Sequence, residues 1–197
     1  MRIKKLSNIT MLSLLVGILA LNSVSFAESA MQNKFSDTKI KEEQHEKPSS
    51  IRSEYAELNK AISKMNKGTF NTTKQNIKTA FDEISELIPR ILPKGMTLSS
   101  SAQGNINNIE KIMDKIDNAK NPEQLIIIEK EGVDAAVSAL KDINNRAGSK
   151  ISNLDKELSS VVEFSKVINV QNYQYQSMIT FKKLSSIMEK MNTHFNK

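Results

Sequence analysis

Residues 181–195 read FKKLSSIMEKMNTHF, and the apolar residues in this stretch decide the fold. Phe181, Leu184, Met188, Met191 and Phe195 are spaced 3, 4, 3 and 4 residues apart, so they fall on one face of a helix. Such a face is buried against other helices. Because the same spacing recurs upstream, the sequence predicts an all-α chain.

Three upstream segments carry apolar stripes with this period. Their members are Ile51, Tyr55, Leu58, Ile62 and Met65; Ile77, Phe81, Ile84 and Ile88; and Ile106, Ile109, Met113 and Ile116. The first helix is expected between Pro48–Ser50 and Gly68. For the second, Asn71 or Thr72 is the expected N-cap, and Pro89 and Pro93 end the helix. The third is expected from about Ser101 to Ala119.

The middle of the chain is less regular. Asn121-Pro122 combines an N-cap residue with a proline suited to the first helical position. The consecutive residues Leu125–Ile128 allow either a short buried strand or a helix. No partner strand is evident, so we expect a helix that is buried nearly all round, is interrupted by Gly132 and ends at Gly148.

Two helical segments complete the chain. Ile151, Leu154, Leu158 and Val161 open the fifth helix, and residues 181–195 lie in the last. The sequence leaves open whether Asn169–Asn172 bends or breaks the segment between them. Residues 51–197 are therefore predicted to form an antiparallel bundle of five or six helices that pack near +20°. The chain has no cysteine, so packing alone must stabilise it.

The N-terminal residues predict export. Residues 1–27 resemble a signal peptide, with basic Arg2, Lys4 and Lys5, an apolar run over Ile9–Leu21, and small Ser25 and Ala27 before cleavage at Glu28. The apolar run is too short to span a bilayer of about 30 Å. Without a cysteine the chain cannot be a lipoprotein. Residues 28–50 are charged and aperiodic, so we expect a disordered, flexible leader there.

The charge of the mature chain argues against nucleic acid as a partner. The whole chain has 28 basic and 22 acidic residues. Loss of the three basic signal residues leaves 25 against 22, a net charge of only +3. A protein that neutralises many phosphates needs a sustained basic face. We therefore expect no nucleic-acid binding, and no stable insertion into a membrane.

The residue inventory favours a protein that is not an enzyme. His45 lies with Glu42, Glu43 and Glu46 in the leader, where no metal site is preorganised, and His194 suits the C-terminal end of a helix dipole. Ser99–Ser101 suit helix capping. Other carboxylates fall on faces expected to be solvated: Asp82, Glu83, Glu86, Glu110 and Asp114. We expect no catalytic residue, metal or cofactor.

Binding surfaces are the better candidates. Tyr173 and Tyr175, near Lys182 and Lys183, form a possible partner site, although two tyrosines two residues apart on a helix point in different directions and one should be in the core. A possible basic stripe consists of Lys60, Lys64, Lys67, Lys74 and Lys78; a plain solubilising face is the alternative. Ile91, Leu92, Met96 and Leu98 form either an exposed partner site or a loop that folds back over the bundle.

The overall layout resembles one family. A composition rich in isoleucine, lysine and asparagine, the signal-like Met1–Ala27, the charged leader and the helical region Ile51–Phe195 resemble the plasmid-encoded exported antigens of Lyme-disease Borrelia, the exported plasmid protein A and BapA group. The resemblance implies a secreted or surface-associated virulence antigen with a helical fold and no assigned catalytic residues. We thus expect binding to a host protein or an extracellular-matrix component. A periplasmic structural or chaperone-like protein is the alternative.

Overall fold

A computed structural model describes residues 55–197. The expected signal peptide (1–27), the leader (28–50) and the stripe residue Ile51 lie outside the described residues. Within residues 55–197 the chain is 78% helical, with six α-helices and no strand. The predicted all-α fold is confirmed.

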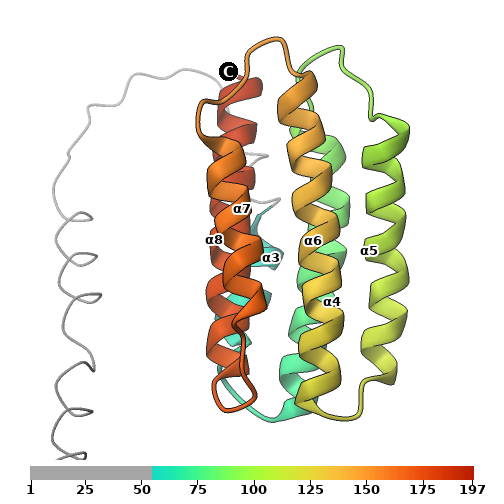
Figure 1. The fold of residues 1–197 in the computed structure, drawn as a ribbon, viewed down its shortest axis with the longest axis vertical. Coiled ribbons are helices and arrows are strands. Elements are labelled where there is room, and N and C mark those ends of the chain that lie inside the picture. Colours follow the sequence, from blue (N-terminus) through green and yellow to red (C-terminus); the bar gives the residue numbers. More distant parts are fainter. Residues whose placement is uncertain (1–54) are drawn as a thin grey trace, which may run out of the picture. The chain divides into compact units, whose positions relative to one another are not determined.

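The helices follow one another with short connections. They are α3 (Ala56–Lys64), α4 (Phe70–Leu87), α5 (Ser100–Asn118), α6 (Pro122–Arg146), α7 (Leu154–Lys166) and α8 (Tyr173–Phe195), with the 3₁₀-helix η1 (Ile88–Ile91) directly after α4. Consecutive helices run antiparallel (Figure 1).

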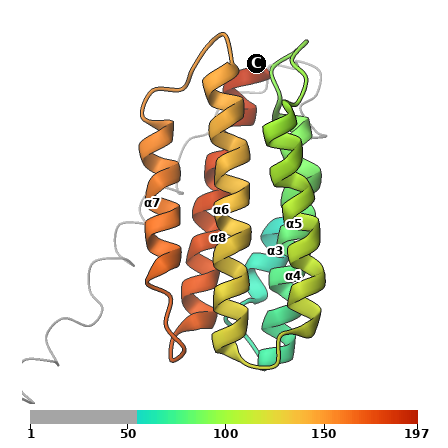
Figure 2. The ribbon, with the colours of Figure 1, turned by 45° about the vertical axis from the view of Figure 1, so that its right-hand side comes forward.

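Three helices form the centre of the bundle. Since neighbours in the chain alternate in direction, α4, α6 and α8 all run the same way, and they contact one another (Figures 1 and 2). The other three pack against pairs of them: α5 against α4 and α6, α7 against α6 and α8, and α3 against α4 and α8. We call the end with the α3–α4, α5–α6 and α7–α8 loops the lower end, as Figure 1 shows it.

Side-chain caps explain where the helices begin. Ser99 Oγ accepts from the Ala102 amide at the start of α5, and Asn121 Oδ1 accepts from Gln124 at the start of α6 with Pro122 as the first helical residue. Both caps were expected. The N-cap prediction for α4 was wrong, because Thr69 accepts from the Thr72 amide and α4 begins before Asn71.

The apolar stripes form one core. Of the predicted stripe residues within 55–197, nearly all are less than 9% exposed; the exceptions are Met113 and Phe195, which are half-buried. On α5, Ile112 is buried in place of Met113. Ile91 is also buried, while Leu92, Met96 and Leu98 pack against the core. The loop after η1 therefore folds back over the bundle instead of forming an exposed apolar site.

The expected character of α6 was only partly right. It is a helix, as expected, but it is not buried nearly all round, because Ile127 is 62% exposed while Leu125 is fully buried. Gly132 does not interrupt it, since α6 is continuous to Arg146. A Cβ atom at Gly132 would lie 2.4 Å from Phe81 Cζ, so glycine is required by close packing.

Phe81, Gly132 and Phe181, one from each central helix, form what we call the aromatic layer. The rings of Phe81 and Phe181 meet edge to face with centroids 4.9 Å apart, and both are fully buried. The layer fills the space between α4, α6 and α8 without a polar atom from a side chain.

The chain breaks between α7 and α8. Residues 167–172 are not helical, which answers the question left open for Asn169–Asn172. Among residues 55–197, no helix has both the length and the apolar composition needed to cross a bilayer.

Candidate functional site

The start of α8 is held by polar side chains in place of an ordinary N-cap. Asn172 makes no side-chain capping bond. Instead, Asn169 Oδ1 accepts from the Asn172 amide at 3.1 Å, and Gln176 Oε1 accepts from the Asn169 amide at 2.8 Å. The loop and the first turn of α8 are thus fixed to each other.

Gln174 connects this turn to the neighbouring helices. Its Nε2 donates to Thr73 Oγ1 on α4 at 2.8 Å and to the Gly68 carbonyl in the α3–α4 loop at 3.1 Å. Thr73 Oγ1 in turn donates to the Met65 carbonyl at 2.9 Å. These bonds join α8, α4 and the end of α3 through the buried side chain of Thr73 and the partly buried side chain of Gln174.

Ser177 makes the contact with α6. Its Oγ donates to Glu129 Oε2 at 2.7 Å, and both residues are fully buried. Glu129 lies one turn before Gly132, and Ser177 one turn before Phe181. We call Glu129 and Ser177 the polar layer, since they lie one helical turn below the aromatic layer.

The two tyrosines of this segment have opposite environments. Tyr173 is buried and its ring centroid lies 6.5 Å from that of Phe70, and burial raises the pKa of its phenol. Tyr175 is 54% exposed. The expectation that one of the two belongs to the core is confirmed. Tyr175 therefore projects from a turn whose flanking side chains, Gln174 and Gln176, are both hydrogen-bonded.

Exposed apolar side chains gather at the lower end. The large hydrophobic residues that are exposed within 55–197 are Ile127, Val167, Val170 and Tyr175. Val167 is 62% exposed and Val170 38%; both lie in the α7–α8 loop, a few residues before Tyr175. The sequence interpretation had not singled out the two valines.

Lys182 and Lys183 follow on the outer side of α8. They line a groove of about 370 Å³ between α7 and α8, together with Val161 and Ile187. Lys183 Nζ lies 4.4 Å from the ring centroid of Phe164, and no carboxylate of the described residues pairs with Lys182 or Lys183. Glu157, also in the groove, pairs with Lys190 at 2.6 Å. We call Val167, Val170, Tyr175, Lys182 and Lys183 the α8 surface.

The predicted lysine stripe does not form one row of unpaired cations. Lys60 pairs with Glu57 at 3.1 Å on α3. On α4, Lys74 Nζ donates to the Asp117 carbonyl of α5 and to the carbonyl of its C-cap Ala119, each at 3.3 Å, and Lys78 pairs with the Asp117 carboxylate. Of these five lysines, Lys64 and Lys67 are exposed and have no such partner among the described residues.

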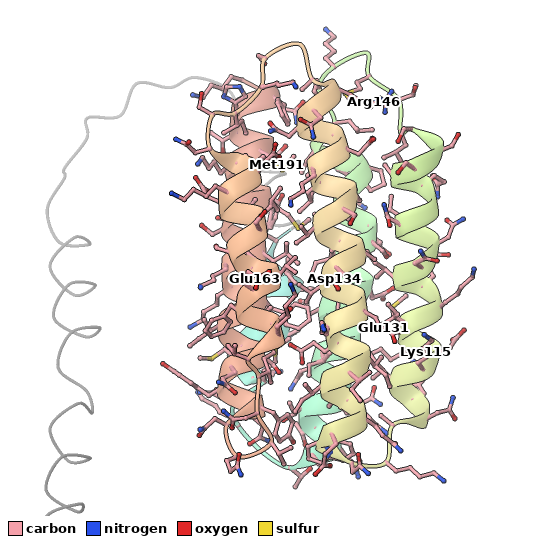
Figure 3. All side chains as sticks on the ribbon, in the orientation of Figure 1. Lys115, Glu131, Asp134, Arg146, Glu163 and Met191 are labelled. Carbon is pink, nitrogen blue, oxygen red and sulfur yellow. The ribbon has the colours of Figure 1, made fainter. Side chains whose placement is uncertain are left out.

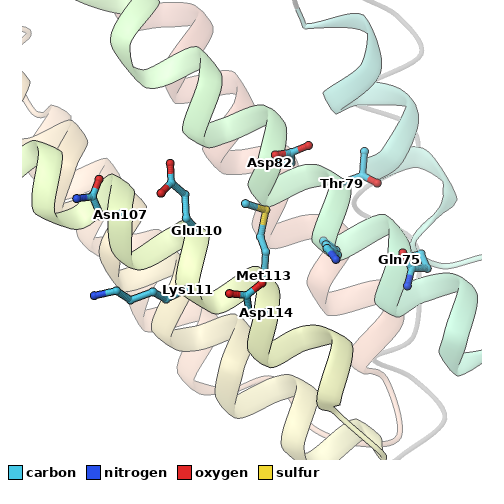
Figure 4. A pocket seen from close by; sticks show the side chains of 9 residues that line it. Gln75, Thr79, Asp82, Asn107, Glu110, Lys111, Met113 and Asp114 are labelled. Atoms are coloured by element: carbon cyan, nitrogen blue, oxygen red, sulfur yellow. The ribbon is translucent and has the colours of Figure 1, made fainter.

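A second groove, between α4 and α5, is lined mainly by polar side chains, with Met113 as the apolar exception. It encloses about 740 Å³ and is lined by Asp82, Glu110 and Asp114 together with Lys78 and Lys111 (Figure 4). The three carboxylates are exposed, as expected of a solvated face. Glu83, next to Asp82 on α4, is half-buried, and its pKa is raised by burial first and then by Glu86, Asp82 and Glu57.

In the part of the chain that the structure describes, neither the ion pairs nor the groups that could bind a metal point to a further candidate site. On the outer face, Lys115 of α5 meets Glu131 of α6 at 2.6 Å (Figure 3), a surface pair worth at most about 1 kcal/mol. Within residues 55–197, no group of three or more histidine, cysteine, aspartate or glutamate side chains is placed to hold a metal ion. His194 Nε2 lies 3.0 Å from the Ser149 carbonyl.

Comparison with protein-family models, curated proteins and solved structures finds no match to this chain.

Sequence reasoning missed Glu129, although the pattern contained a signal. Leu125, Glu129, Gly132, Ala136 and Leu140 are spaced 4, 3, 4 and 4, so Glu129 lies on the buried stripe of α6. A charged residue in such a position marks either a buried polar contact or an error in the stripe.

Proposed function

We propose that this protein is exported and acts as a binding protein, secreted or at the outer cell surface, with a host protein or extracellular-matrix component as its partner. The signal-like residues 1–27 and the resemblance to exported Borrelia antigens support export. The proposal assigns no catalytic role, metal or cofactor to the chain.

The observation that carries the proposal is the exposed Tyr175 on a turn held by hydrogen bonds. Tyrosine side chains are enriched among the residues that dominate binding energy. A side chain presented from a fixed turn also loses less conformational freedom when a partner binds. Tyr175 meets both conditions, because Gln174 and Gln176 fix the backbone on either side of it.

The surroundings of Tyr175 suggest the chemistry of the partner. Val167 and Val170 add apolar contact area, and Lys182 and Lys183 add positive charge without carboxylate partners. Charges at the edge of an interface steer association and select against wrong partners. A partner with an apolar contact region bordered by acidic side chains fits this surface.

A photo-crosslinking amino acid in place of Tyr175, in the mature chain, tests the site. The matched control carries the same amino acid in place of Asn107, which is also exposed, on α5. With host extracellular-matrix proteins as probes, we expect adducts from position 175 and none from position 107. Adducts of equal yield at both positions, or at neither, would contradict the proposal.

Location needs a separate experiment. Protease added to intact cells should remove the protein if it is exposed on the outer surface, and the secreted form should be present in the medium. Complete protection of a cell-retained protein would instead favour the periplasmic structural or chaperone-like role.

A further inference from the structure

Glu129 is an acid without an ionic partner in the centre of the bundle. Its side chain is fully buried, Oε2 accepts from Ser177, and Oε1 has no hydrogen-bond partner. An ionised carboxylate in such a place is strongly disfavoured unless it is paired. Burial therefore raises the pKa of Glu129 from its ordinary value of 4.5 to about 8, and the Ser177 hydrogen bond opposes this only in part.

Several charged groups on the surrounding helices have partners of their own, and none of them acts on Glu129. Lys60 of α3 pairs with Glu57; on α4, Lys74 and Lys78 contact α5; Lys115 of α5 pairs with Glu131; and Lys166 of α7 pairs with Glu163. On α8, the ionisable Tyr173 is associated with Thr73 and Gln174. No charged side chain contributes to the pKa of Glu129.

The position of Ser177 links this acid to the α8 surface. Ser177 is two residues from Tyr175, and its bond to Glu129 joins the first turns of α8 to α6. The other bonds in these turns go to α4, to the α3–α4 loop and to the α7–α8 loop. The side-chain hydrogen bond between α6 and the start of α8 thus involves a group that can lose a proton.

We propose that Glu129 and Ser177 form a pH-sensitive link that keeps the first turns of α8 against α6 while Glu129 is neutral and favours their separation as the pH rises. The link controls how Tyr175 is presented. This consequence for binding rests on the function proposed above, whereas the link itself does not require a partner.

Proton linkage sets the direction and the size of the effect. In the separated form Glu129 meets water and ionises at its ordinary pKa of 4.5, whereas in the closed form it ionises at about 8. Between these two values the separated form has lost a proton that the closed form keeps. Its population should therefore rise about tenfold per pH unit in this window and stay level above it.

Hydrogen exchange of backbone amides, read by mass spectrometry on the mature protein, tests the link. Protection factors are compared at about pH 5.5 and about pH 7.5 after correction for intrinsic exchange rates. In the native sequence, protection over residues 173–181 should fall about a hundredfold between the two pH values. In Glu129→Gln, which keeps the shape and removes the charge, it should stay level.

Ser177→Ala and Glu129→Gln together show whether the carboxyl group of Glu129 causes the pH dependence. Ser177→Ala retains the acid, so the pH dependence should persist from a lower starting protection. Equal pH dependence of protection over residues 173–181 in the native protein and in Glu129→Gln would overturn the proposal. Crosslinking at position 175 is unaffected by that outcome, so the two proposals fail separately.

Discussion

The aromatic layer and the polar layer are one helical turn apart, yet they solve the same packing problem in opposite ways. In the aromatic layer, Gly132 leaves room for Phe81, whose ring meets Phe181 at 4.9 Å. In the polar layer, Glu129 meets Ser177 at 2.7 Å and keeps one oxygen without a hydrogen-bond partner. Both layers join α6 and α8.

The difference shows that one core can contain a layer whose contribution to stability is independent of pH and a layer whose contribution depends on pH. Apolar contacts of the aromatic layer do not change with pH, and their loss leaves a cavity. The polar layer contributes a contact whose strength depends on one proton. This proton-dependent contact involves Ser177, two residues after Tyr175 on α8.

Loss of a ring from the aromatic layer should have the largest effect. Phe81→Ala removes a fully buried ring from between the central helices, so we expect a loss of about 3–5 kcal/mol in the free energy of unfolding. Urea denaturation followed by circular dichroism measures it. A loss below about 1 kcal/mol would show that the layer is not a tightly packed unit.

The polar layer should make stability depend on pH. The folded-state pKa of Glu129 is about 8 and the ordinary value is 4.5. The stabilising effect of proton binding is therefore complete below about pH 4.5 and is lost as the pH rises toward 8, by up to about 1.4 kcal/mol per pH unit. Urea denaturation at about pH 5.5 and pH 7.5 should show this loss in the native protein and not in Glu129→Gln. If the free energy of unfolding changed equally with pH in both proteins, Glu129 would not be the source of the change. The polar layer would then not differ from the aromatic layer in its response to pH.

Close packing at Gly132 should give a smaller effect that depends on its neighbour. A methyl group in Gly132→Ala would meet Phe81, so we expect a loss of about 1–3 kcal/mol despite the better helix propensity of alanine. In the Phe81→Ala background the same change should be neutral or stabilising. Additive losses in the double variant would mean that the two residues do not compete for the same space.

The α8 surface should contribute least to stability. Tyr175→Ala should change the free energy of unfolding by no more than about 0.5 kcal/mol, because the side chain is 54% exposed. Tyr173→Ala, its matched control two residues earlier, should cost several times more because Tyr173 is buried. Thermal denaturation of both variants measures the two losses of stability. Similar losses would show that Tyr175 is part of the core and is not a surface binding residue.

Much of the fold could be predicted because helices bury one face at a fixed period. The stripes on α3, α4, α7 and α8, the Asn121 cap and the Pro122 start all follow from local chemistry. The start of α4 did not, because Thr69, Asn71 and Thr72 are all suitable caps and only tertiary packing selects among them. The exposed Ile127 shows the converse, since composition alone cannot say which side of α6 a neighbour covers.

Only part of the candidate site could be predicted from the sequence, and the reason is physical. Helical geometry requires Tyr173 and Tyr175 to diverge, but it does not say which one is buried. That depends on Phe70 and on the bonds of Gln174 to α4, which are far away in the sequence. The Glu129–Ser177 contact joins residues 48 positions apart, so no local pattern contains it.

The central claim is that the core of this bundle holds a neutral carboxylic acid next to the segment that presents Tyr175. Carbon-13 NMR of glutamate side-chain carboxyl groups measures its titration directly, with Glu129→Gln identifying the resonance by its absence. We predict a midpoint near pH 8 for Glu129. A midpoint near the ordinary value of 4.5 would show that the carboxyl group is ionised and solvated, and would contradict the account.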